Sequence, residues 1–116
     1  MATNQPAPQP SANDVLASLG AAADAARQAY MVALAANPGA NLSALYSAEM
    51  KALAIWSAAQ NNALTINPAL TTAQVNLDEA TQAIRSQLAT LKDITTWLGL
   101  ITNLVQLAAT VGKFFA

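Results

Sequence analysis

The fold depends on residues 72–113, which read TAQVNLDEATQAIRSQLATLKDITTWLGLITNLVQLAATVGK. Residues that favour helix fill this stretch, and its first strong stop signal is Gly112. An unbroken helix of this length would extend about 60 Å, at about 1.5 Å per residue. Alternatively the helix breaks near residues 93–96, where Asp93 would cap a fourth helix and a β-branched run begins. The unbroken form is our preferred prediction.

The rest of the chain predicts two shorter helices, over about residues 12–36 and 42–65, ahead of the third over 72–113. Residues 1–11 form a Pro-rich N-terminal segment, and 12–116 form a single helical domain. The fold class is therefore all-α. We expect a helical hairpin packed on a long third helix or, if the break occurs, a four-helix bundle with short connections.

Capping and stop signals set the predicted boundaries. Ser11 with Asp14 three residues on matches a capping box at the start of the first helix. The Asn-Pro-Gly sequence at residues 37–39 ends that helix, since proline cannot continue one and glycine accepts a positive φ. Ile-Asn-Pro at residues 66–68 is predicted to end the second helix. Thr71, followed three residues later by a glutamine, is predicted to cap the third.

The composition leaves little catalytic chemistry. Charged residues make up 9% of the chain, against about 25% in an average soluble domain. The absence of His and Cys excludes imidazole bases, thiolate nucleophiles, the usual zinc sites and disulfides. No carboxylates are spaced as an acid–base pair on one helix, and the glycines do not form a phosphate-binding loop. We predict a non-enzymatic protein with no cofactor, metal or small-molecule substrate, and the net charge of −1 offers no footprint for nucleic acid.

The C-terminal segment, from about residue 94 to residue 116, is predicted to make the functional contact. Residues 94–112 carry no charge and would span about 28 Å as a helix, close to the roughly 30 Å hydrocarbon core of a bilayer. The predicted association or membrane-contact residues are Trp97, Leu98, Ile101, Leu104, Val105, Leu107, Val111, Phe114 and Phe115. A polar stripe is predicted along Thr96, Gly99, Asn103, Gln106, Thr110 and Lys113.

Helical spacing predicts which side chains are buried. The apolar seam of the long helix is predicted to run through Ile84, Leu88, Leu91, Ile94, Leu98, Ile101, Val105 and Ala108. We expect Tyr30, Tyr46, Trp56 and the methionines to pack in the core. Asp24 and Arg27, three residues apart on the first helix, are predicted to form a surface ion pair.

Three functional interpretations follow from this pattern. The preferred one is self-association, as a subunit of a homo-oligomer, filament or coat, because few charges leave apolar surface exposed on a small chain. The second is a membrane-active component that inserts its C-terminal helix, with lipid as its partner. The third is a soluble helical adaptor or chaperone. The N-terminus lacks the basic start and apolar run of a Sec signal, which predicts a cytoplasmic protein or export by a non-Sec route.

The layout also resembles two functional families. A helix, an Asn-Pro-Gly turn and a second helix, over about residues 30–64, are similar to the helical hairpins of secretion-system needle subunits. That resemblance implies polymerisation, although the long uncharged C-terminal segment departs from the needle pattern. The charge-poor helices also resemble components of helical pore-forming toxins, which implies membrane insertion.

Overall fold

The computed structural model describes residues 11–37, 39, 41–90 and 93–115. They form four helices, α1 (Ala12–Ala36), α2 (Ser43–Ala59), α3 (Pro68–Gln87) and α4 (Ile94–Gly112). No strand occurs within these residues; one isolated antiparallel bridge joins Leu64 and Phe115. The all-α class is therefore confirmed. The Pro-rich segment predicted over residues 1–11 lies outside the described residues, apart from its last residue.

The preferred prediction of a single helix over residues 72–113 is wrong, and the alternative four-helix bundle is what forms. The Asp93 side chain accepts a hydrogen bond from the Thr95 backbone N–H at 3.4 Å and from the Thr96 hydroxyl at 2.8 Å. The Thr95 N–H is one of the backbone groups at the start of a helix that have no partner within the helix, so Asp93 acts as the N-cap of α4. An unbroken helix would have outrun its partners, whereas the break lets α4 fold back beside α3.

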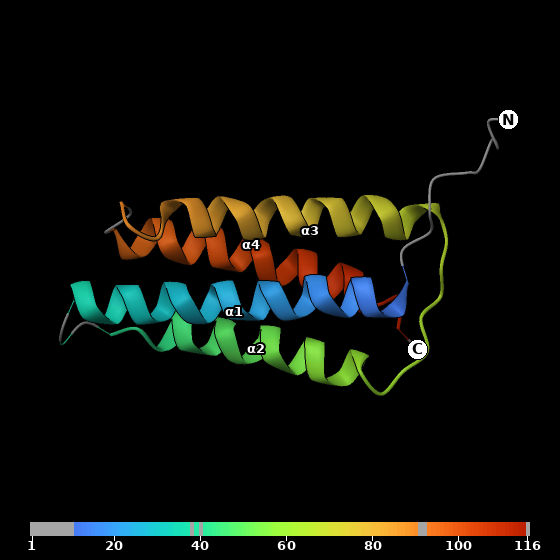
Figure 1. Ribbon diagram of the computed structural model, residues 1–116. Helices are drawn as coiled ribbons and strands as arrows, with labels where there is room; N and C mark the ends of the chain where they lie inside the picture. Colours follow the sequence, from blue (N-terminus) through green and yellow to red (C-terminus); the bar gives the residue numbers. More distant parts are fainter. Residues whose placement is uncertain (1–10, 38, 40, 91–92, 116) are drawn as a thin grey trace, which may run out of the picture.

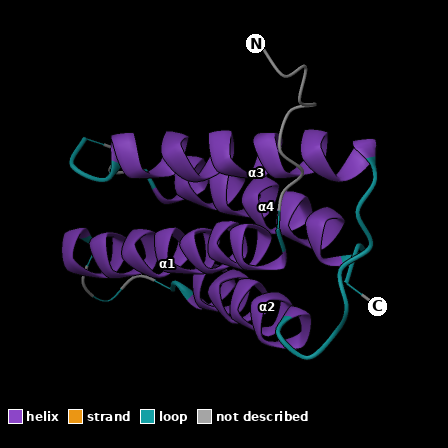
Figure 2. Cartoon of the chain, turned by 45° about the vertical axis from the view of Figure 1, so that its right-hand side comes forward, coloured by secondary structure: helices purple, strands orange, loops and turns teal. Residues whose placement is uncertain are grey.

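The helices run up, down, up and down around one core (Figure 1). α1 and α4 each pack against the other three helices. Among the described residues α2 and α3 do not contact each other, and they occupy opposite corners of the bundle (Figures 1 and 2). The connection between α2 and α3 is fastened to the end of α4, because the Thr65 backbone N–H donates to the Phe114 carbonyl at 2.7 Å.

The predicted capping box at the start of α1 is confirmed. The Asp14 backbone N–H donates to the Ser11 hydroxyl at 3.1 Å, and the Ser11 N–H donates to the Asp14 carboxylate at 3.3 Å. α1 ends at Ala36, as predicted, and Gly39 has a φ of 84° in the following turn. That positive φ suits glycine, since residues that have a Cβ rarely adopt it.

The boundaries predicted between α2 and α3 are wrong. α2 ends at Ala59 rather than near residue 65, because the side-chain amides of Asn61 and Asn62 donate to two of its last carbonyls, at 3.2 and 2.9 Å. α3 begins at Pro68 rather than residue 72. The Asn67 side chain accepts from the next two free backbone N–H groups, at 3.0 and 3.2 Å, and proline at the first helical position lacks an N–H that would need a partner.

The core combines the many alanines of α1 with large side chains from all four helices. In α1 the alanines at positions 22, 25, 26, 29 and 33 are fully buried. Their small side chains allow α1 to lie close to three neighbours at once. The space is filled by large side chains that are almost fully buried: Leu19, Leu45, Leu70, Leu77, Ile84, Trp97, Ile101 and Leu104.

Candidate association surface

The structure divides the predicted contact residues of the C-terminal segment into two groups. Trp97, Ile101, Leu104, Val111 and Phe115 belong to the core. Leu98, Val105, Leu107 and Phe114 are half-buried and pack against that core from its edge. The first group is covered by the other helices, so it reaches a second molecule only if α4 leaves the bundle. The second group keeps partial access to solvent.

The predicted polar stripe of α4 faces solvent. All six of its members are exposed: Thr96, Gly99, Asn103, Gln106, Thr110 and Lys113. The Thr110 hydroxyl donates to the Gln106 carbonyl at 3.0 Å, one turn earlier in the same helix. In this arrangement the stripe is the hydrated side of an amphipathic helix.

α4 is nevertheless apolar for a helix at a protein surface. Among the described residues it is the one helix long and apolar enough to cross a membrane, with a mean hydropathy of 1.4 over its best window. Only 28% of that window is buried inside the bundle. Length and composition alone do not separate a membrane-spanning helix from a core helix, and α4 supplies core residues.

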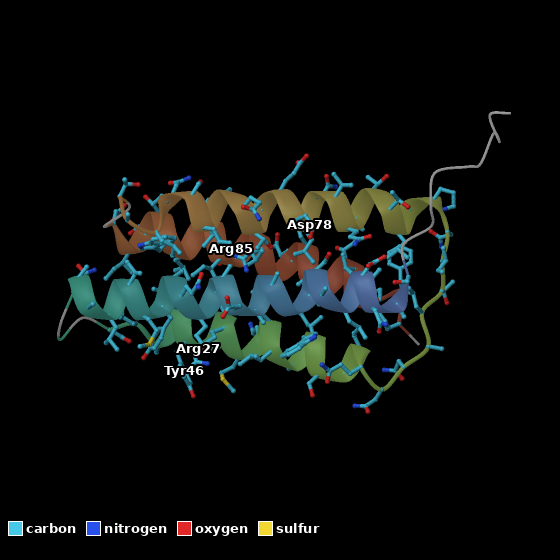
Figure 3. The ribbon with its side chains drawn as sticks, viewed as in Figure 1. Arg27, Tyr46, Asp78 and Arg85 are labelled. Atoms are coloured by element: carbon cyan, nitrogen blue, oxygen red, sulfur yellow. The ribbon has the colours of Figure 1, made fainter. Side chains whose placement is uncertain are left out.

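Four of the six large apolar side chains that are exposed in the described residues gather elsewhere, on α1 and α2. Met31 and Leu34 are 54% and 42% exposed, and Tyr46 and Met50 are 50% and 46% exposed. Residues 30, 31 and 34 lie on one side of α1, and 46 and 50 on one side of α2. The two sides join where the Tyr30 and Tyr46 rings lie with centroids 5.6 Å apart. We call these five residues the tyrosine–methionine surface; Figure 3 labels one of them, Tyr46.

A groove between α1 and α2 continues this surface toward the start of α1. It holds about 250 Å³ and is lined by Gly20, Ala23, Asp24, Arg27, Glu49, Leu53 and Trp56. Gly20 matters here because a Cβ at its position would lie 3.2 Å from the Trp56 ring. The indole therefore packs directly on the α1 backbone and forms one wall of the groove.

The charges around the groove are arranged differently from the prediction. Asp24 pairs with Arg85 of α3 at 3.7 Å, and not with Arg27, so the predicted Asp24–Arg27 pair is wrong. Arg27 is exposed, whereas Glu49 is only 7% exposed. Figure 3 shows Arg27 and Tyr46 directed toward the same side of the bundle, away from Asp78 of α3.

The expectation that the tyrosines and methionines lie in the core is wrong for most of this surface. Tyr46 and the two described methionines are about half exposed. The sequence held a signal of this outcome. α2 carries large apolar residues on more than one side, since Leu45 and Tyr46 are adjacent in the chain and project about 100° apart around the helix.

Comparison of the chain with protein-family models, with curated proteins and with solved structures finds no match. Within the residues that the structure describes, no three carboxylates lie together in a way that would hold a metal ion.

Proposed function

We propose that this protein acts by self-association, and that the tyrosine–methionine surface is its contact. One observation carries the proposal: of the six large apolar residues exposed in the described chain, four lie on the adjoining halves of α1 and α2. Soluble monomers rarely expose contiguous apolar patches larger than a few hundred Å², and larger patches mark interaction sites. Aromatic residues and methionine are also enriched in protein–protein interfaces.

Covering this surface would contribute to holding two copies together, against an association cost of about 4–15 kcal/mol. A tyrosine buries about 150–250 Å² when it is fully covered, so Tyr46 has about 100 Å² left to bury. At about 25 cal/mol per Å² this is worth about 2 kcal/mol. In a symmetric dimer the same contact forms twice, giving about 4 kcal/mol, or about a thousandfold in the dissociation constant.

Sedimentation equilibrium tests the proposal. We expect the wild-type chain to exceed its monomer mass of 11.9 kDa at micromolar concentration. Tyr46→Glu and Met50→Glu should each shift it to the monomer, because a carboxylate would have to be buried in the contact. Val75→Glu is the matched control, since Val75 is 49% exposed on α3, which does not contact α2.

Two outcomes would contradict self-association through this surface. One is a wild-type mass of 11.9 kDa over the whole concentration range. The other is a loss of assembly in Val75→Glu equal to that in Tyr46→Glu. A monomer that also fails to bind vesicles would favour the adaptor or chaperone interpretation.

The second candidate function is membrane insertion of α4, supported by its length and its hydropathy. Vesicle flotation measures binding directly. Insertion is followed by quenching of Trp97 with brominated acyl chains, in a Trp56→Phe variant that leaves one indole. A blue shift is a poor readout because Trp97 is already 0% exposed in the bundle. Flotation together with quenching would favour insertion. If neither is observed, self-association remains the better proposal.

A further inference from the structure

The groove between α1 and α2 has the chemistry of a guanidinium acceptor. Glu49 provides a carboxylate, and Trp56 provides an aromatic wall, both lining a space of about 250 Å³. An arginine side chain suits such a site because its planar head binds carboxylates and also stacks on aromatic faces. Glu49 is 7% exposed, so an ion pair formed there is shielded from solvent more than a pair on an open surface.

The donor for such a site lies on the same surface. Arg27 is exposed at the edge of the groove. The nearest carboxylate on its own helix, that of Asp24, is engaged by Arg85. Within the described part of the chain, neither Arg27 nor Glu49 forms an ion pair at 4 Å or less. A surface that holds both a donor and its acceptor can complement itself across a two-fold axis.

The register of α1 against α2 determines which symmetry does this. Gly20 of α1 lies against Trp56 of α2. Tyr30, ten residues later in α1, lies against Tyr46, ten residues earlier in α2. In this antiparallel register Arg27 of α1 is level with Glu49 of α2. A two-fold axis parallel to the helices sets α1 of one copy opposite α2 of the other at the same level. Arg27 then faces Glu49 of the second copy, and the two tyrosine–methionine surfaces also meet.

The other face-to-face symmetry is disfavoured by charge when its axis lies at the level of Arg27. A two-fold axis perpendicular to the helices, at the level of Arg27, sets α1 opposite α1 and brings two guanidinium groups together. Like charges in an interface select against that arrangement.

We infer that a second copy of this chain docks on the α1–α2 surface about an axis parallel to the helices, with Arg27 of each copy entering the groove of the other beside Glu49 and Trp56. This inference rests on the proposed function and specifies its partner and geometry. It also explains why the groove lies directly beside the tyrosine–methionine surface, since one contact covers both.

A mixing experiment tests whether the charge pair crosses between copies. Arg27→Glu alone places only carboxylates at this level, and Glu49→Lys alone places only cations. Each variant alone should weaken the dimer at least about tenfold, because like charges meet twice across the axis. An equimolar mixture should restore the dimer, since every contact in the mixed pair joins opposite charges. A pair within one copy would gain nothing from mixing.

Two further variants guard against a folding defect at the buried position. The double variant Arg27→Glu/Glu49→Lys restores opposite charges in either geometry, and its circular dichroism melt shows whether lysine is tolerated there. The milder Glu49→Gln replaces Glu49→Lys if it is not. A labelled Arg27→Glu chain should then be recruited by Glu49→Gln into a mixed dimer, because that pair contains no like-charge contact.

The outcomes separate this inference from the proposal on which it depends. A dimer recovered only on mixing supports the crossed pair. Single variants that dissociate and do not recover on mixing place the pair inside one copy, which overturns the inference and leaves self-association standing. Single variants that stay dimeric while Tyr46→Glu dissociates also overturn it. A wild-type chain that is monomeric throughout removes both.

Discussion

Replacing Ile101 by alanine should reveal whether α4 is a core helix. Ile101 is 0% exposed, and it lies in the middle of α4 among the side chains of the shared core. The change removes three carbon atoms, worth about 2.4 kcal/mol at about 0.8 kcal/mol each. The cavity adds to this, because a well-packed core relaxes only in part. We expect a total loss of about 3–4 kcal/mol in the free energy of unfolding.

Urea denaturation followed by circular dichroism measures this loss. With an m value of about 1.5–2 kcal/mol per molar, the midpoint should fall by about 2 M. Asn103→Ala is the control, since it lies on the exposed side of the same helix and should change stability by less than about 0.5 kcal/mol. Equal midpoints for the two variants would refute the packing of α4 in the core. They would favour a helix that functions in a membrane.

Two other stability predictions use the same assay. Gly99→Ala should stabilise the protein by about 0.5–1 kcal/mol, because nothing lies within 4 Å of the added Cβ and alanine favours helix; Gly112→Ala should instead destabilise it, since its Cβ would lie 2.9 Å from the Ile55 Cγ2. Gains of equal size for both would show that α2 and α4 do not approach as closely as described. Asn67→Ala should cost about 1 kcal/mol, because the side-chain oxygen of Asn67 accepts from two backbone N–H groups at the start of α3; an unchanged midpoint would mean that this cap contributes nothing.

Local capping signals located two helix starts and misplaced a third: the cap predicted at Thr71 is wrong, because Thr71 lies inside α3. Ser11 and Asp93 each precede a helix that begins at the next residue. Asn67-Pro68 was harder to interpret, because proline both ends one helix and begins another. We assigned it to the end of the second helix, whereas it begins α3. The end of α2 at Ala59 shows which of the two applies, because residues 60–67 then form the connection between α2 and the start of α3.

The buried side of α4 could not be chosen from spacing alone. The predicted seam passed through positions 94, 98, 101, 105 and 108, whereas the buried residues are at 97, 101, 104, 108 and 111. Both series step by threes and fours and share Ile101 and Ala108. An uncharged helix offers several overlapping apolar stripes, and its hydropathy does not rank them. The neighbouring helices decide, and α4 turns Trp97 rather than Leu98 into the core.

The exposure of the tyrosine–methionine surface was missed for a related reason. Periodicity identifies a helix side that prefers burial, but it does not say how many sides the partners cover. α2 contacts α1 and α4 and leaves its outer side free, so Tyr46 and Met50 stay exposed. That outcome depends on α3 occupying the corner opposite α2, which is a property of the assembled bundle.

The two proposed functions make unequal demands on this bundle. Insertion of α4 into a bilayer requires its withdrawal from the core, where Trp97, Ile101 and Leu104 are each fully buried. Uncovering such side chains costs about 1.5–3 kcal/mol each, so these three alone approach the roughly 5–15 kcal/mol that stabilises a typical domain. Docking on the tyrosine–methionine surface requires no unpacking, because its side chains already face solvent. The proposed self-association would therefore need no unfolding of the bundle, whereas insertion would have to recover in the bilayer most of the free energy that holds the bundle together.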